Sequence, residues 1–172
     1  DSRTGLLPED PAVLDCAHIL SNSPNCELLG TMTHGGHSYN CENITEIKSV
    51  AEAERSAVVT AAKAIRKTGL TCPIVSVGST PTALHAECLD GVTEMRPGVY
   101  MIGDLFQCSI GSCSFDDLAL SVLVSVNAWR KEEQRAMVDA GALALSRDLG
   151  APDENGDYAY GMATDVEGSP HA

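Results

Sequence analysis

The stretch Ser76-Val-Gly-Ser-Thr-Pro-Thr82 decides the fold, because the apolar run Pro73-Ile-Val75 precedes it and a helix-prone run, residues 83–88, follows it. A buried strand that turns through glycine and hydroxyl residues into a helix directs backbone N–H groups and hydroxyls at one point. Such a point suits a phosphate group. The alternative is an ordinary strand-to-helix turn in which Thr80 caps the helix, Pro81 takes its first position and nothing binds.

Helices and apolar runs alternate on both sides of this stretch. The expected elements, in chain order, are a helix over Asp10–Asn22, a strand over Glu27–Thr33, a helix from the capping-box residue Asn43 to Lys67, the central strand and short helix, and a strand within Gly91–Ile102. Gly69 is expected to end the long helix. This alternation predicts parallel strands joined by helical crossovers.

The pattern changes after Asp104. The segments Leu118–Val126 and Arg135–Asp139 are typical of β-strands, residues 142–146 are ambiguous and residues 152–156 are turn-like. We therefore expect two domains: an α/β segment over residues 1–104, and the start of a mainly antiparallel β domain over residues 105–172.

Composition excludes several classes of function. The net charge of −13, the pI near 4.6 and the 4% aromatic content argue against a nucleic-acid partner. No apolar run is long enough to span a bilayer, so no membrane association is expected. Seven cysteines without C-x-x-C spacing indicate reduced, mostly buried thiols in a cytoplasmic protein.

Three further motifs could carry chemistry. His34-Gly-Gly-His-Ser-Tyr39 follows a predicted strand, where ligands bind in α/β folds. A metal site there would need a third ligand, a simple polar loop is the plainer alternative, and a flat cofactor suits the loop best because His can stack on a ring and Tyr can bind a phosphate. Arg96-Pro-Gly-Val-Tyr100 and Arg3-Thr-Gly5 could each be ordinary surface segments when taken alone.

Together these motifs resemble the fold-type III pyridoxal-phosphate enzymes. The matching segments, in order, are Arg3-Thr-Gly5, Leu29–Tyr39, Ser76–Thr82, Thr93–Tyr100 with Asp104, and Asp139–Asp148. The chain is most similar to the branch that contains D-threonine aldolase and D-serine dehydratase, which is related to alanine racemase. The resemblance implies that residues 1–104 form the second half of a pyridoxal-phosphate-binding TIM (β/α)8 barrel of the alanine racemase type. It implies that residues 105–172 begin a mainly β, D-serine dehydratase-like C-terminal domain.

The resemblance also implies roles for individual residues. Gly78, Ser79 and Thr80 would hold the phosphate of pyridoxal phosphate, with Tyr39 and the backbone of Gly98 and Val99. His34 would lie against the pyridine ring, Arg3 near its phenolic oxygen, and Arg96 or Tyr100 near its nitrogen.

The resemblance implies that two sets of functional residues of the family lie outside this chain. The resemblance places the lysine that forms the Schiff base on a strand before Arg3. The lysines of this chain are no substitute, because Lys48, Lys63 and Lys67 lie on the long predicted helix and Lys131 in a polar turn. The ligands of a divalent metal (Zn, Mn or Mg) would follow Ala172. The resemblance thus implies an internal segment that is inactive by itself, without a catalytic residue or metal ligand of its own.

The implied parent protein is a homodimeric lyase that acts on D-β-hydroxy amino acids through an external aldimine. Aldol cleavage or dehydration remain open as the reaction. An amino-acid racemase and a non-catalytic protein that carries pyridoxal phosphate are the alternatives.

Overall fold

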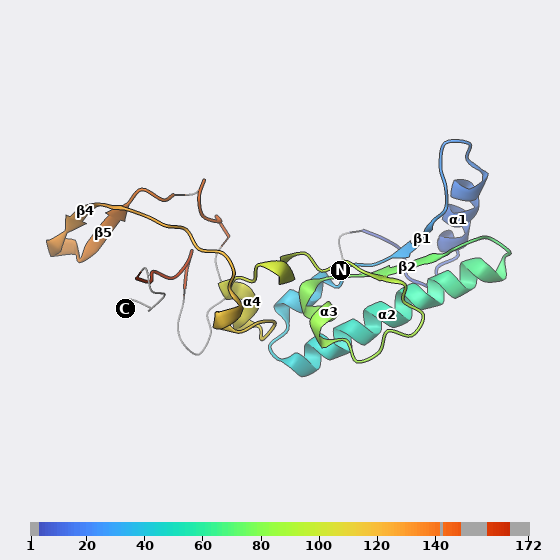
Figure 1. Cartoon of the computed structure of the whole chain (residues 1–172). Coiled ribbons are helices and arrows are strands. Elements are labelled where there is room, and N and C mark those ends of the chain that lie inside the picture. Colours follow the sequence, from blue (N-terminus) through green and yellow to red (C-terminus); the bar gives the residue numbers. More distant parts are fainter. Residues whose placement is uncertain (1–3, 142, 149–157, 166–172) are drawn as a thin grey trace. The chain divides into compact units, whose positions relative to one another are not determined.

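The computed structural model of the chain describes residues 4–141, 143–148 and 158–165 (Figure 1). The chain divides into two units, Asp1–Tyr100 and Met101–Ala172. The expected domain boundary after residue 104 stays a prediction.

Three short strands form a parallel sheet in the first unit. They are β1 (Gly30–Met32), β2 (Ile74–Val77) and β3 (Glu94–Met95), in the order β1-β2-β3. The prediction of parallel strands with helical crossovers is confirmed. The strands differ in extent from the predicted runs. In particular, β2 continues through Ser76 and Val77, which the sequence had suggested to be part of the loop.

Strand β3 is much shorter than the predicted run Gly91–Ile102. Pro97 has no N–H for a sheet hydrogen bond, and Val99–Met101 form a 3-10 helix, η2. The third strand therefore ends early, and Gly98 to Tyr100 lie beyond the sheet.

Gly30 allows β1 and β2 to approach closely. A Cβ atom built on Gly30 would lie 1.9 Å from the carbonyl oxygen of Ile74, far inside any van der Waals contact. The parallel register pairs these same two residues. Glycine is therefore required at the first position of β1.

The long helix α2 (Ile44–Lys67) is confirmed together with its ends. The Asn43 side chain accepts a hydrogen bond from the Glu46 N–H at 3.0 Å, and a Glu46 carboxylate oxygen accepts from the Glu42 N–H at 2.9 Å. Gly69 follows the helix with a φ of +88°, a conformation that favours glycine. Helix α1 (Ala12–Asn22) also agrees with the prediction.

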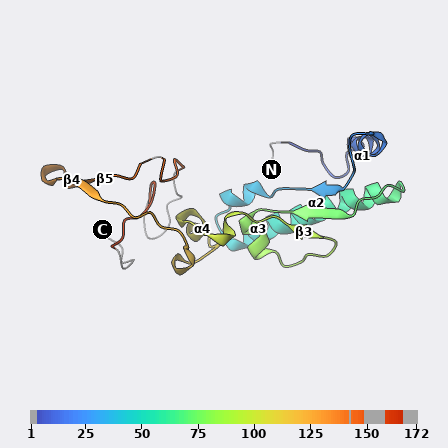
Figure 2. The same ribbon diagram turned by 45° about the horizontal axis from the view of Figure 1, so that its top comes forward.

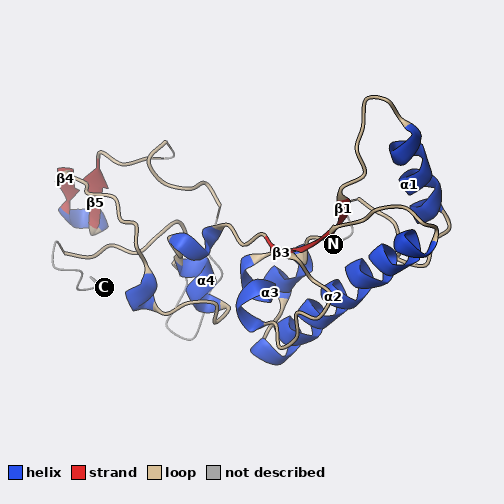
Figure 3. Cartoon of the chain, turned by 45° about the vertical axis from the view of Figure 1, so that its right-hand side comes forward, coloured by secondary structure: helices blue, strands red, loops and turns tan. Residues whose placement is uncertain are grey.

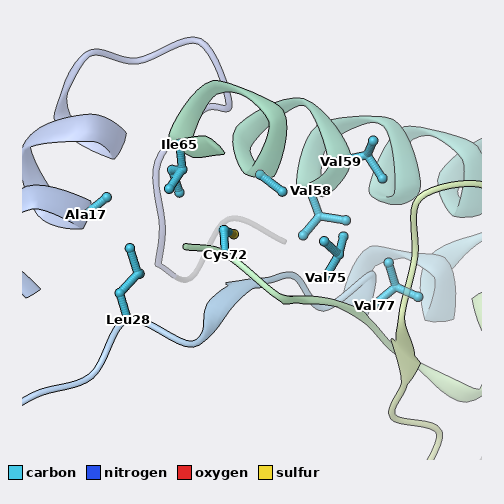
Figure 4. Packing of buried hydrophobic residues seen from close by; sticks show 9 residues of the cluster. Ala17, Leu28, Val58, Val59, Ile65, Cys72, Val75 and Val77 are labelled. Carbon is cyan, nitrogen blue, oxygen red and sulfur yellow. The ribbon is translucent and has the colours of Figure 1, made fainter. Parts of the chain in front are cut away.

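The core of the first unit lies between α2 and the sheet (Figures 1 and 2). Figure 4 shows Val58 of α2 directed toward Val75 of β2, with Ile65 and Cys72 further along the same layer. The buried members of this cluster are Ala17, Leu28, Val58, Val59, Ala62, Ile65, Cys72, Val75 and Val77. Residues of β2 that face α2 are thus fixed by apolar packing.

Helix α3 (Thr80–His85) begins earlier than predicted. Its N-cap is Ser79, whose backbone is extended (φ −165°, ψ 161°) and whose hydroxyl accepts from the Thr82 N–H. The alternative in which Thr80 caps the helix and Pro81 takes its first position differs from the structure, where Ser79 is the cap and Thr80 is the first helical residue. The helix also ends before the predicted Cys88, since Ala86 is extended.

The described residues of the second unit form short helices and a hairpin (Figure 3). Its elements are α4 (Leu105–Ser109), η3 (Phe115–Asp117), β4 (Val126–Arg130), η4 (Lys131–Glu133) and β5 (Arg135–Val138). Strands β4 and β5 pair in antiparallel fashion, which agrees with the predicted strand at Arg135–Asp139.

The predicted strand over Leu118–Val126 was wrong. Within the described part of the chain, residues 118–125 pair with no strand, and β4 begins only at Val126. A β-type composition does not make a strand without a partner to accept its backbone hydrogen bonds. Residue 142, the first of the ambiguous segment 142–146, and the whole turn-like segment 152–156 lie outside the described residues.

The cysteines differ from expectation in their burial. All seven are free, but Cys72 is the buried one, while Cys16, Cys26 and Cys88 are exposed and the other three are half-buried. The prediction of mostly buried thiols was therefore wrong. Among the described residues, no helix combines the length and the apolar character that crossing a bilayer would take.

Candidate functional site

The loops that follow β1 and β2 meet at one end of the parallel sheet. After β1 the chain forms a 3-10 helix, η1 (Gly36–Asn40), and after β2 it enters α3. The hydroxyl oxygens of Ser38 and Ser79 lie 3.1 Å apart, and both side chains are buried. Two motifs that are distant in sequence are thereby joined at the carboxyl ends of neighbouring strands, where ligands bind in such sheets.

The Ser79 hydroxyl is engaged within the protein. Besides Ser38, its oxygen lies 2.8 Å from the Thr82 hydroxyl and accepts from the Thr82 N–H at 3.3 Å. This hydroxyl therefore organises the first turn of α3. Pro81 has no N–H, and the Ala83 N–H donates to the Ser79 carbonyl oxygen at 3.0 Å, so the Thr80 N–H is the donor of this turn left without a helix carbonyl or the Ser79 cap.

The Thr80 hydroxyl has a different environment. Thr80 is 1% exposed, and its Oγ1 atom has no hydrogen-bond partner in the part of the chain that the structure describes. A buried hydroxyl without a partner costs about 1–3 kcal/mol. An acceptor supplied by a ligand would remove that cost.

Gly78 brings the backbone close to its surroundings. Its N–H donates to Oε1 of Glu54 at 3.0 Å. A Cβ atom on Gly78 would lie 3.0 Å from both the Cβ and the carbonyl oxygen of Arg96. A side chain at this position would displace the segment that carries Arg96.

Arg96 is held across the sheet. Its Nε donates to the Ser76 hydroxyl at 2.7 Å, and its Nη2 donates to the carbonyl oxygen of Thr33. The Ser76 hydroxyl in turn donates to a Glu94 carboxylate oxygen at 2.6 Å. The guanidinium thus connects the ends of β1, β2 and β3, and its orientation is fixed.

The other residues predicted to bind the cofactor are half-buried or exposed. His34 and Tyr39 are half-buried in the loop after β1, and Val99 is half-buried at the start of η2. Gly98 and Tyr100 are exposed. Arg3 lies outside the described residues.

The structure adds residues that sequence reasoning missed. Glu54 of α2 is 7% exposed and contacts both loops. The available signal was its spacing, since it falls in line with Ile47, Ala51 and Val58 on the buried stripe of the helix. Ser38 was within a motif already noted, but nothing in the sequence indicated its contact with Ser79.

The metal alternative for His34 and His37 gains no support. Over the described residues, there is no cluster of three or more His, Cys, Asp or Glu side chains that could hold a metal ion. The arrangement instead offers a hydroxyl and backbone N–H groups, and hydrogen-bond donors of this kind suit an anionic group.

Comparisons with known proteins agree with this geometry. Residues 1–105 match the family model of the alanine racemase N-terminal domain. The chain is 43% identical over 166 residues to D-threo-3-hydroxyaspartate dehydratase of Delftia sp. (strain HT23), covering 96% of this chain and 44% of that protein. It is 33% identical over 155 residues to D-serine dehydratase of Dictyostelium discoideum, covering 86% of this chain and 39% of that protein.

Solved structures give the same result. The Delftia dehydratase superimposes with a TM-score of 0.91 at 44% identity, over 98% of this chain and 45% of that one. An alanine racemase-like protein from Idiomarina loihiensis gives 0.90 at 38% identity, over 99% and 45%. D-threonine aldolase from Filomicrobium marinum, at 23% identity and a TM-score of 0.68 over 88% and 41%, shows the shared fold alone.

The chain spans less than half the length of the curated relatives that it matches. The partial α/β barrel of the alanine racemase type, predicted from the motifs, is confirmed. With its parallel strands, its loop junction and its matched residues 1–105, the chain belongs to the alanine racemase N-terminal domain family, among the fold-type III enzymes.

Proposed function

We propose that the whole protein is a pyridoxal-phosphate-dependent lyase that dehydrates a D-β-hydroxy amino acid, and that this chain supplies much of the cofactor's binding site. The two curated relatives above 30% identity are both dehydratases of such amino acids. The aldolase is too distant to argue for its own reaction. Dehydration is therefore favoured over aldol cleavage, which the sequence left open.

The observation that carries the proposal is the buried, unpartnered Thr80 hydroxyl at the first turn of α3. A phosphate oxygen is the acceptor that such a donor lacks. The residues present therefore fit the phosphate of the cofactor. When bound, the cofactor supplies an electron sink that lets a bond at the substrate's Cα break heterolytically.

The chain's residues would hold and orient this group. Thr80 would donate its hydroxyl and, with Ser79, its backbone N–H to the phosphate, because the Ser79 hydroxyl is already engaged with Ser38 and Thr82. Tyr39 and the backbone of Gly98 and Val99 would complete this cup.

The ring would be held by other residues. His34, which follows β1, would pack against its face. Arg96, whose orientation Ser76 and Thr33 fix, would lie near its nitrogen, with Tyr100 as the other candidate for that position. Arg3 would bind near the phenolic oxygen.

A divalent metal belongs to the same proposal. One solved relative is a mutant of D-threo-3-hydroxyaspartate dehydratase in its metal-free form. The ligands of such a metal are expected outside this chain, and the chemistry that it would supply is Lewis-acid assistance to the loss of a hydroxyl group. A homodimer and a cytoplasmic location complete the proposal.

The test is turnover by the whole protein, with and without a chelator. D-threo-3-hydroxyaspartate and D-serine should each give an α-keto acid and ammonia, the chelator should abolish this activity, and added divalent metal should restore it. L-isomers should not react. Glycine as the main product from D-threonine would establish an aldolase instead, and metal-independent interconversion of D- and L-alanine would establish a racemase.

A further inference from the structure

Glu54 is a charged residue at a core position. On α2 it follows Ile47 and Ala51 and precedes Val58 along the buried stripe, and it is 7% exposed. The other buried residues of this helix are all apolar. Burying a carboxylate costs much free energy unless hydrogen bonds compensate, so a specific role must be sought in its partners.

Those partners are the residues that follow two neighbouring strands. Oε1 of Glu54 accepts from the Thr33 hydroxyl at 2.9 Å and from the Gly78 N–H at 3.0 Å. Strand β1 ends at Met32 and β2 ends at Val77, so each donor is the first residue beyond its strand. One oxygen of α2 thereby ties the starts of both loops together.

The loop after β1 also packs directly on this carboxylate. A Cβ atom on Gly35 would lie 3.1 Å from Oε2 of Glu54 and 2.9 Å from the Thr82 methyl group. Gly35 is buried, so the loop is packed between α2 and the first turn of α3. Glu54 therefore sets the positions of Thr33, Gly35 and Gly78 at once.

We propose that Glu54 is a positioning residue for the cofactor's phosphate, a proposal that rests on the function proposed above. It fixes the backbone at Gly78, one residue before Ser79 and two before Thr80, and it fixes the loop that carries His34 and Tyr39. It does not itself donate to the phosphate, because a carboxylate has no hydrogen to give.

Charge alone predicts the opposite effect. A carboxylate near a phosphate repels it, so removing the charge would strengthen phosphate binding if Coulomb repulsion were the main influence of Glu54. Positioning instead requires the hydrogen-bond acceptor and not the charge. Glu54→Gln, which keeps an acceptor oxygen but loses the charge, separates these two effects.

The experiment compares affinities for pyridoxal phosphate and for pyridoxal, which lacks the phosphate, in the whole protein. Glu54→Ala should weaken binding of pyridoxal phosphate by about tenfold or more, and binding of pyridoxal by a clearly smaller factor, because pyridoxal keeps only the ring contact of His34. Glu54→Gln should stay within about threefold of the wild type for both. Thr33→Val removes one of the two hydrogen-bond donors to Glu54, so it should also weaken binding of pyridoxal phosphate more than binding of pyridoxal, but by a smaller factor. This variant replaces Glu54→Ala in the test if the alanine variant does not fold.

Val58→Ala is the matched control on the same stripe. Val58 is 2% exposed and belongs to the apolar cluster, so its truncation should lower the melting temperature without changing the ratio of the two affinities. An unchanged ratio in Glu54→Ala and Thr33→Val, or tighter phosphate binding by Glu54→Gln, overturns the inference. A wild-type protein that binds neither compound rejects the proposed function itself, and the inference with it.

Discussion

The hydroxyl oxygens of Ser38 and Ser79 lie 3.1 Å apart although 41 positions separate the two residues. Ser38 belongs to the short 3-10 helix after β1, and Ser79 caps the helix after β2. Neither side chain is accessible to water. The contact therefore links the two loops of the candidate site independently of any ligand.

This link predicts coupled effects on stability. Ser79→Ala removes the N-cap as well as the contact and should lower the free energy of unfolding by about 1–2 kcal/mol, whereas Ser38→Ala should cost about 1 kcal/mol. Because the two variants remove one shared hydrogen bond, the double variant should lose less than the sum. Urea unfolding of the four proteins measures this, and strict additivity would contradict a direct interaction.

Part of this junction could be predicted and part could not. The alternation of elements and the capping box at Asn43 were readable, because apolar spacing and capping chemistry are local properties. The exact cap of α3 was not, since Ser79 and Thr80 both carry a hydroxyl and the backbone dihedral angles decide between them. Glu54 was missed because a glutamate within a helix is normally solvated, and only its buried partners show otherwise.

The second unit was harder to predict for a related reason. Leu118 to Val126 has a composition typical of strands, yet β4 extends from Val126 through Trp129 to Arg130. Strand pairing depends on distant partners rather than on local preference. The helix α4 also escaped notice, although Asp104 caps it by accepting from the Gln107 N–H at 2.7 Å.

We expect removal of the Thr80 hydroxyl to have opposite effects on stability and on affinity for the cofactor. Thr80→Val should leave the cofactor-free protein as stable as the wild type or more so, because it removes a buried hydroxyl without a partner. The same variant should lower the affinity for pyridoxal phosphate by about ten- to a hundredfold, the value of a hydrogen bond to a charged group. Thr80→Ser, which keeps the hydroxyl, is the control. Equilibrium dialysis and thermal unfolding provide the two measurements, and unchanged affinity would place the phosphate elsewhere.

We expect Gly30 and Gly98 to differ in how well each position tolerates a side chain. Gly30→Ala should destabilise the protein by about 3 kcal/mol or more, because its methyl group would overlap the Ile74 carbonyl oxygen between β1 and β2. Gly98→Ala should change stability by less than about 0.5 kcal/mol, since a Cβ there meets nothing within 4 Å. Thermal unfolding of both variants tests the pair, and equal effects would contradict the strand register.

We expect the thiol of Cys108 to react slowly with alkylating agents. Burial and a hydrogen bond with Cys113, whose sulfur lies 3.4 Å away, raise the pKa of Cys108 to about 12 from its ordinary value of 9.0. Because the thiolate is the reactive form, iodoacetamide at pH 8 should label the exposed Cys26 well before Cys108. Peptide mass spectrometry measures this order, and labelling in urea, where both should react alike, is the control.

The same pKa shift fixes the sign of a pH effect. The unfolded chain loses the Cys108 proton first as the pH rises, so the stability that the neutral thiol contributes is complete below about pH 9 and falls between pH 9 and about 12. Replacement of Cys108 by alanine should reduce this alkaline loss of stability. Equal losses in both proteins would contradict the assignment.

The hairpin of β4 and β5 has a consequence for backbone dynamics. Every residue of both strands is exposed, including Trp129 at 59%, and the turn places Gln134 in the left-handed region with a φ of 50°. A two-stranded hairpin without a buried face is only marginally stable in water. The amide protons of the hairpin should therefore exchange with deuterium far faster than those of β2. Slow exchange at Trp129 in the whole protein would instead measure the free energy with which contacts outside the hairpin stabilise it.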